Sequence, residues 1–350
     1  MITTNQKIST LDWRVLLRFF LAITTVVFSF AAHADGEFKS AGLEKLQINS
    51  GICNGWWGQA SWKCTPASIP GYLAVPNDTS KNIVVIVSHG SQGLDLHHRW
   101  YADHLAEQGY YALVLDHWTP RGLGQVQRSG YTKASLGSGG NALNMAIDTL
   151  AATVALRKDE RFKNARFAHL GESMGASVAR ELNRPWVYRA AAQVLGEEPT
   201  EPKAFIALYM GCTEKNKNDR FKNIPVLFIN GDKDDDTAVG PCRDFVQFMN
   251  DRGGNAKLVE IPGAYHQFDS FYKLAYFGDI ENPSQCANTG DPEGKIYTLD
   301  KTGKTYPFNS EGFAALRKDC IGRGAHAGGS GIEGVGFDLW TNFLAETLRP

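Results

Sequence analysis

The strongest chemical signal in this sequence is the pentapeptide Gly171-Glu172-Ser173-Met174-Gly175. An apolar run at 167–170 precedes it, and a segment typical of a helix follows at 176–182. A G-x-S-x-G between a strand and a helix makes a sharp turn, because the two glycines lack side chains that would collide with the adjoining elements. The pattern predicts that Ser173 is presented as a nucleophile. Since ordinary turns can also match so short a pattern, the prediction depends on partners elsewhere in the chain.

A serine nucleophile needs a base that accepts its proton and an acid that orients the base. After a turn of this kind the acid and then the histidine follow in chain order. One apolar run, 226–229, ends in a turn with four aspartates, and another, 257–261, ends shortly before His266. The four aspartates are Asp232, Asp234, Asp235 and Asp236. Each of them fits the acid, and the turn also fits a hydrated acidic loop or a weak calcium site. His266 fits the base, and it also fits an ordinary loop histidine.

Ester chemistry at a serine also needs two N–H donors for the developing oxyanion. The backbone N–H of Met174 is the first candidate, because it follows the nucleophile. The second is expected in the turn at 89–93, where Ser91 is the favoured residue. A plain tight turn is the alternative for that segment.

Short apolar runs alternate with longer helical patterns from residue 81 onward, which predicts βαβ units and an α/β fold with a mostly parallel sheet. Strands are expected at 82–88, 110–116, 166–170, 204–210, 226–229 and 256–261, and helices at 100–108, from Ser138 or Asn141 to 156, at 176–182, 242–252 and 337–348. A segment at 71–76 is expected to form an antiparallel edge strand, where Pro76 is tolerated. Residues 278–331 are predicted to be an insertion or long loop before the last helix. The serine, acid and histidine then all follow strand ends at one edge of the sheet.

The N-terminal residues 1–34 are typical of a secretory signal. Arg14 and Arg18 precede an apolar stretch at 19–32, and Ala32-His33-Ala34 fits an A-x-A cleavage site. A transmembrane anchor is the alternative, but the stretch is shorter than the ~20 residues that a span needs. Cleavage after Ala34 leaves one α/β domain at 35–350, with an N-terminal extension at 35–69, in the periplasm or outside the cell. We expect no membrane span in this mature chain.

Charge argues against nucleic acid or an anionic surface as a partner. Residues 1–34 hold three of the 36 basic and one of the 37 acidic residues, so the rest of the chain has a formal net charge of −3. All six cysteines follow residue 34, and an even number in an exported chain favours disulfides. Because loop closure costs least for near neighbours, the expected pairs are Cys53–Cys64, Cys212–Cys242 and Cys286–Cys320. A metal site is disfavoured because close C-x-x-C pairs are absent from the sequence.

Three weaker signals give no site. His97, His98 and His104 lack an acidic or thiolate ligand at a suitable spacing, so they are expected at exposed loop and helix positions. The glycines at 122–124 and 137–140 do not form a dinucleotide-binding pattern, and no cofactor is expected. Trp56, Trp57 and Trp62, inside the expected Cys53–Cys64 loop, are expected to pack on the domain.

Over residues 70–275 the chain resembles the dienelactone hydrolase family of α/β-hydrolases. The pieces that carry the resemblance are 71–76, 88–91, 105–110, 120–122, the pentapeptide, Gly231-x-x-Asp234 and His266-Gln267-Phe268-Asp269. The resemblance implies Asp234 as the acid and His266 as the base. The namesake enzymes use a cysteine nucleophile where this chain has Ser173, which argues against dienelactone itself as the substrate.

Together these features predict an exported serine hydrolase that cleaves a small-molecule ester or lactone. The alternatives are a peptidase or acyltransferase with the same residues, a non-catalytic binding protein whose pocket the 278–331 segment blocks, and a calcium-dependent module built on the Asp232–Asp236 turn.

Overall fold

A central sheet of eight strands organises the computed structural model, which describes residues 38–54, 63–123, 141–329, 331 and 333–349. The strands are β1 (Glu44–Asn54), β2 (Lys63–Ala74), β3 (Ile83–Ser88), β4 (Tyr111–Leu115), β5 (Arg166–Glu172), β6 (Phe205–Leu208), β8 (Pro225–Gly231) and β9 (Asn255–Ile261). Their order is β1-β2-β4-β3-β5-β6-β8-β9. The six strands from β4 to β9 are parallel, and β2 is antiparallel to both β1 and β4. The predicted parallel α/β sheet is therefore present.

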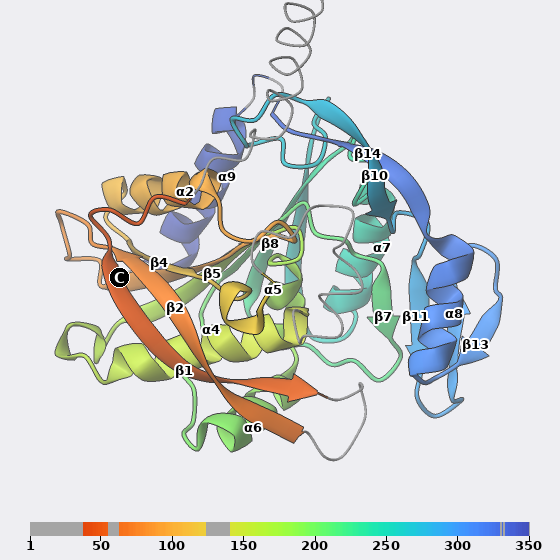
Figure 1. The fold of residues 1–350 in the computed structure, drawn as a ribbon, viewed down its shortest axis with the longest axis horizontal. Coiled ribbons are helices and arrows are strands. Elements are labelled where there is room, and N and C mark those ends of the chain that lie inside the picture. The colour runs from red at the N-terminus through yellow and green to blue at the C-terminus, as the bar shows by residue number, and fades with distance from the viewer. Residues whose placement is uncertain (1–37, 55–62, 124–140, 330, 332, 350) are drawn as a thin grey trace, which may run out of the picture. The chain divides into compact units, whose positions relative to one another are not determined.

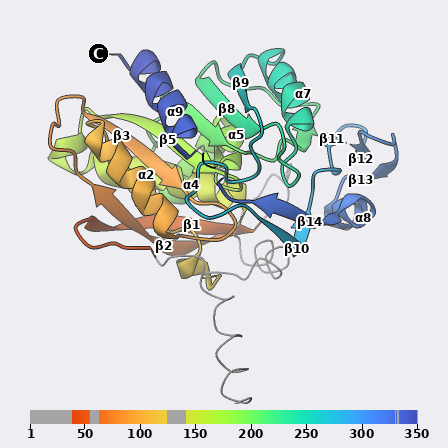
Figure 2. The same ribbon diagram turned by 90° about the horizontal axis from the view of Figure 1, so that it is seen from above.

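The central strands are apolar on both faces, which is why they stand out as continuous apolar runs. In β3, Val85 and Val87 pack in one core cluster, while Val84 and Ile86 pack in another. Helices α2 (Leu96–Glu107) and α9 (Glu333–Thr347) cover one face of the sheet (Figure 1). Helices α4 (Ala142–Arg157), α5 (Ser177–Leu182) and α7 (Val239–Asn250) cover the other (Figure 2). Helix α6 (Pro185–Leu195) packs beside α4 and β1.

One strand expectation needs correction, and one strand was not predicted. The segment at 71–76 is not an edge strand, because β2 lies between β1 and β4 and ends before Pro76. The edge is β1, which pairs with β2 along its whole length and was not predicted.

Asn141 caps α4, accepting a hydrogen bond from the Asn144 N–H at 3.0 Å.

The segment predicted as an insertion or long loop is folded. Strands β10 (Ala275–Asn282) and β14 (Gly322–Ala327) form an antiparallel pair. Between them lie β11 (Asn288–Asp291), β12 (Ile296–Leu299), β13 (Thr305–Pro307) and α8 (Ser310–Cys320), and β11 pairs in parallel with β7 (Glu214–Asn216). Tyr297, Leu299, Tyr306 and Leu316 form a small core of their own. We call residues 275–327 the insertion.

Three disulfides have the pairing favoured by the sequence: Cys53–Cys64, Cys212–Cys242 and Cys286–Cys320. The first joins residues that face each other in the β1–β2 register, and the third lies in the core of the insertion. The expected signal segment, the three tryptophans at 56, 57 and 62, and the glycines at 137–140 lie outside the described residues. No helix in the described part of the chain is both long and apolar enough to cross a membrane.

Candidate active site

Ser173 lies at a tight turn between β5 and α5, as the pentapeptide predicts. Its φ is +49°, a left-handed conformation that is strained for a residue with a side chain. A Cβ at Gly171 would overlap the carbonyl of Gly175, and a Cβ at Gly175 would overlap the carbonyl of Ser88 on the neighbouring strand. Glycine is therefore required on both sides of the serine.

The structure brings Ser173, His266 and Asp234 into one hydrogen-bonded chain. Ser173 Oγ lies 3.1 Å from His266 Nε2, and His266 Nδ1 lies 2.9 Å from Asp234 Oδ2. Thr237, which the sequence reasoning missed, holds the acid: its N–H donates to Asp234 Oδ1 at 2.7 Å and its hydroxyl to Asp234 Oδ2 at 2.7 Å. Asp234 and His266 are both about 5% exposed, so water competes little with these bonds.

The four aspartates of the 232–236 turn have different partners. Asp232 is exposed and accepts from the Gly263 N–H at 2.7 Å. Asp235 accepts from the N–H of His326 on β14 and lies 2.8 Å from its Nδ1. Asp236 lines the pocket beside His266. Among these four carboxylates, Asp234 makes the contact with His266 Nδ1.

Two backbone amides near Ser173 are available to a ligand. Within the described residues, neither the Met174 N–H nor the Ser91 N–H donates a hydrogen bond to another part of the fold. Both residues line the cavity that contains Ser173. This is where the sequence reasoning expected the two oxyanion donors.

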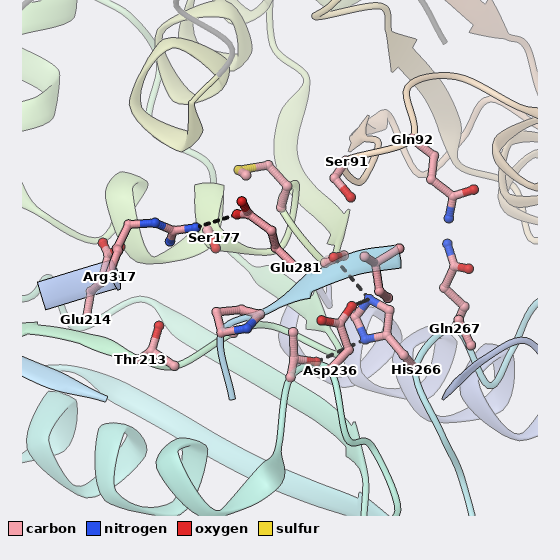
Figure 3. Close-up of a pocket in the computed structure, with 17 residues that line it drawn as sticks. Ser91, Gln92, Ser177, Thr213, Glu214, Asp236, His266, Gln267, Glu281 and Arg317 are labelled. Carbon is pink, nitrogen blue, oxygen red and sulfur yellow. Dashed lines mark hydrogen bonds and ion pairs between the residues drawn. The ribbon is translucent and has the colours of Figure 1, made fainter. Parts of the chain in front are cut away.

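A cavity of about 190 Å³ opens over Ser173 and His266. The insertion supplies one wall of it, through Ile280, Glu281, Pro283, Arg317 and Ala327. Arg317 on α8 and Glu281 on β10 form an ion pair at 3.1 Å in that wall, and Figure 3 shows this pair beside Ser177, away from Ser91 and Gln92. The insertion thus shapes the pocket and leaves it open.

The expectation for His97 and His98 is wrong. Both are buried on α2, with 2% and 0% exposure. His98 Nε2 lies 3.0 Å from Glu172 Oε1, and its Nδ1 lies 2.8 Å from Asp95 Oδ1. Burial alone would lower the pKa of His98, but the two carboxylates raise it to about 10. His98 and Glu172 therefore form a buried ion pair behind Ser173, and the signal for it was the acidic residue inside the pentapeptide.

A second serine–histidine–aspartate arrangement lies deeper in the protein. Ser88 Oγ is 3.0 Å from His117 Nε2, and His117 Nδ1 is 2.8 Å from Asp148 Oδ2. Arg121 donates to both oxygens of Asp148, at 2.8 and 3.0 Å. Because Ser88, His117 and Asp148 are fully buried and do not line the cavity, this arrangement is structural.

Comparison with known families identifies the family to which the chain belongs. Residues 69–277, more than half of the chain, match the model of the dienelactone hydrolase family, and the chain belongs to this family of α/β-hydrolases. No curated protein is similar enough to this chain to count as a relative.

Several solved structures follow a similar path at low sequence identity. A dienelactone hydrolase-like promiscuous phosphotriesterase from metagenomic libraries is 15% identical, with 87% of this chain and 98% of that chain covered and a TM-score of 0.49. An esterase from Thermogutta terrifontis is 13% identical, with 66% and 85% covered and a TM-score of 0.44. A dienelactone hydrolase from Anabaena variabilis is 16% identical, with 64% and 88% covered and a TM-score of 0.40.

Proposed function

We propose that this protein is a serine hydrolase that cleaves a carboxylic ester or lactone through an acyl-enzyme. The observation that carries the proposal is the chain from Ser173 Oγ to His266 Nε2 at 3.1 Å and from His266 Nδ1 to Asp234 Oδ2 at 2.9 Å. A serine hydroxyl is a weak nucleophile unless a base within hydrogen-bond reach takes its proton. The open pocket above Ser173 supports catalysis over the alternative of a blocked, non-catalytic pocket.

In the proposed reaction Ser173 Oγ attacks the acyl carbon and His266 Nε2 takes the hydroxyl proton. The carbonyl oxygen becomes an oxyanion, which the N–H groups of Ser91 and Met174 hold. His266 then gives its proton to the leaving alcohol oxygen as the C–O bond breaks, leaving an acyl group on Ser173. Water repeats the same steps and releases the acid. Asp234 keeps Nδ1 protonated and stabilises the imidazolium in each half.

We further propose that the protein is exported, with residues 1–34 as the signal. Three disulfides support an oxidising compartment, because such bonds are rare in the cytosol.

The small cavity supports a substrate with a short acyl chain.

A fluorophosphonate probe tests the nucleophile directly. We expect labelling of Ser173 in the mature protein, loss of labelling in Ser173→Ala, and strong reduction in His266→Ala. Ser177→Ala is the matched control, because Ser177 lines the same cavity and has no place in the proposed chain. Labelling that falls on Ser177, or labelling of Ser173 that His266→Ala leaves unchanged, would refute the proposal.

A panel of p-nitrophenyl esters of graded chain length, with lactones and anilides, tests the substrate class. We expect turnover of short esters or lactones and at least a hundredfold slower turnover of anilides. Faster cleavage of anilides would identify a peptidase, and acyl transfer to an added alcohol in preference to water would identify an acyltransferase.

A further inference from the structure

The turn between β3 and α2, at 89–93, is held by hydrogen bonds to both backbone groups of one residue, Gly90. Gly90 N–H donates to Glu172 Oε1 at 3.0 Å. Gly90 C=O accepts from the Gly93 N–H at 3.3 Å and lies 2.8 Å from His89 Nδ1. Gly90 N–H is therefore committed to the fold, and the Ser91 N–H is a donor that this turn can offer to an oxyanion.

Fixing the Gly90 carbonyl also fixes the direction of the Ser91 N–H. The two belong to the same planar trans peptide, in which C=O and N–H point in opposite directions. A group that holds the carbonyl on one side therefore aims the N–H to the other. The space around Gly90 is tight: a Cβ there would lie 3.0 Å from Glu172 Oε1 and 3.3 Å from Ser173 Cβ.

His89 is suited to hold that carbonyl because both of its ring nitrogens have defined roles. Its Nε2 accepts from the His117 N–H at 3.2 Å, so its Nδ1 carries the proton and donates to Gly90 C=O. The ring is fully buried, edge-on to Trp118 at 5.5 Å between ring centroids. Burial, with His117 and His98 nearby, lowers the pKa of His89 well below its usual value, which keeps this tautomer neutral.

Glu172, which accepts from the N–H of the preceding peptide, is held just as firmly. Its Oε2 accepts from the Tyr209 hydroxyl at 2.7 Å, and His98 lies 3.0 Å from its Oε1. Burial opposes its ionisation, but the charge of His98 holds the pKa of Glu172 below its usual value. A buried carboxylate with these partners does not turn away from the Gly90 N–H.

We propose that His89 and Glu172 are positioning residues of the oxyanion hole, which together aim the Ser91 N–H at the reacting carbonyl oxygen. The inference rests on the proposed function and deepens it, since neither residue touches the substrate. Removing a whole oxyanion donor costs roughly 10²- to 10³-fold in kcat, and misaiming one costs less.

A matched pair of variants tests His89. His89→Asn places an amide N–H near the position of Nδ1, whereas His89→Leu has a similar shape and no donor. We expect His89→Leu to lower kcat about 10- to 100-fold and His89→Asn to restore most of that loss, with KM of both variants within about twofold of wild type.

Glu172 has its own pair. In Glu172→Gln an amide oxygen at the position of Oε1 still accepts from Gly90, and the amide N–H at the position of Oε2 faces the Tyr209 hydroxyl, so most of kcat should remain. Glu172→Leu removes the acceptor and should lower kcat as His89→Leu does. If Glu172→Leu does not fold, the His89 pair still decides the matter.

The decisive readout is the affinity for a trifluoromethyl ketone, which forms a tetrahedral oxyanion on a serine. We expect its inhibition constant to rise in each leucine variant by the same factor by which kcat/KM falls. The positioning role alone is overturned if the wild type is active and His89→Leu keeps its ketone affinity and its kcat. It is also overturned if His89→Leu loses both no more than His89→Asn does. A folded wild type that neither hydrolyses esters nor binds the ketone overturns the proposed function and this role with it.

Discussion

Asp236 Oδ2 lies 3.7 Å from His266 Nε2, the nitrogen that faces Ser173. His266 thus has a carboxylate on each side, with Asp234 at Nδ1 and Asp236 toward Nε2, while Glu172 acts from farther away. Burial alone would lower the pKa of His266, but these carboxylates raise it to about 9. The imidazolium is stabilised before the reaction as well as during it, so the base is largely protonated at neutral pH.

The first prediction concerns pH. Since the neutral imidazole is the active base, kcat/KM should rise with pH and level off above about 9. Asp236→Asn should move that midpoint to lower pH, and a midpoint one pH unit lower gives about tenfold more neutral imidazole at pH 7. A pH profile of kcat/KM checks both points. Asp232→Asn changes the same charge on the same turn at an exposed site and should leave the midpoint in place; an equal change of midpoint in both variants would contradict the prediction.

The second prediction separates the neighbouring aspartates. Asp234→Asn should lower kcat about 10³- to 10⁴-fold, because the amide favours the wrong tautomer of His266. Asp235→Asn should leave kcat within a few fold, since Asp235 binds His326 of the insertion. Steady-state kinetics on one activated ester decides it. A larger loss in Asp235→Asn would mean that the acid has been misassigned.

The third prediction is that the stability contributed by the pair of His98 and Glu172 is lost in alkali. The pKa of His98 is about 10 in the folded protein and about 6.5 in the unfolded chain. Between these pH values the folded state therefore holds one proton more than the unfolded chain. The stability that this proton contributes is complete below about pH 6.5 and is lost as pH rises to about 10. In His98→Gln the free energy of unfolding should fall less steeply with pH in this range, and the difference in slope should correspond to about one bound proton.

Urea unfolding at a series of pH values measures that slope. His104→Gln is the control on the same helix, because burial lowers the pKa of His104 and gives it no such role on the alkaline side. An unchanged slope in His98→Gln would show that His98 is neutral in the folded protein.

The fourth prediction concerns the disulfide of the insertion. Removing Cys286–Cys320, which spans a sequence separation of 34, should destabilise the insertion by about 3–4 kcal/mol. Hydrogen exchange should quicken at 286–320 and stay unchanged in the central strands, while KM rises and Ser173 still reacts with the probe. The Cys53→Ala, Cys64→Ala variant is the control, since that bridge lies between β1 and β2; equal effects on KM would remove the insertion from substrate binding.

Much of the fold could be predicted because buried parallel strands have continuous apolar runs, as in β3 and β8. Strand β1 lacked that signal: its sequence, Glu44–Asn54, mixes polar and apolar residues as an edge strand does. The short strands of the insertion were missed because three or four residues carry little periodicity, and their stability comes from a disulfide and a few aromatic contacts.

For the site, the sequence predicted the order in which the serine, the acid and the histidine follow along the chain. Sequence alone left four aspartates open, because partners such as Gly263 and His326 come from separate elements; the family resemblance was needed to favour Asp234. The acidic residue in the pentapeptide was a signal, but the sequence did not show that Glu172 at the end of β5 meets His98 on α2. Arg317 and Glu281 carried no motif at all, and only the fold of the insertion brings them to the pocket.

The insertion has a core and a disulfide of its own, yet it contributes none of the three side chains in the proposed proton path. Natural variation or laboratory recombination can therefore replace the insertion as a unit and change which molecules enter the pocket. The proposed nucleophile, base and acid would be inherited unchanged.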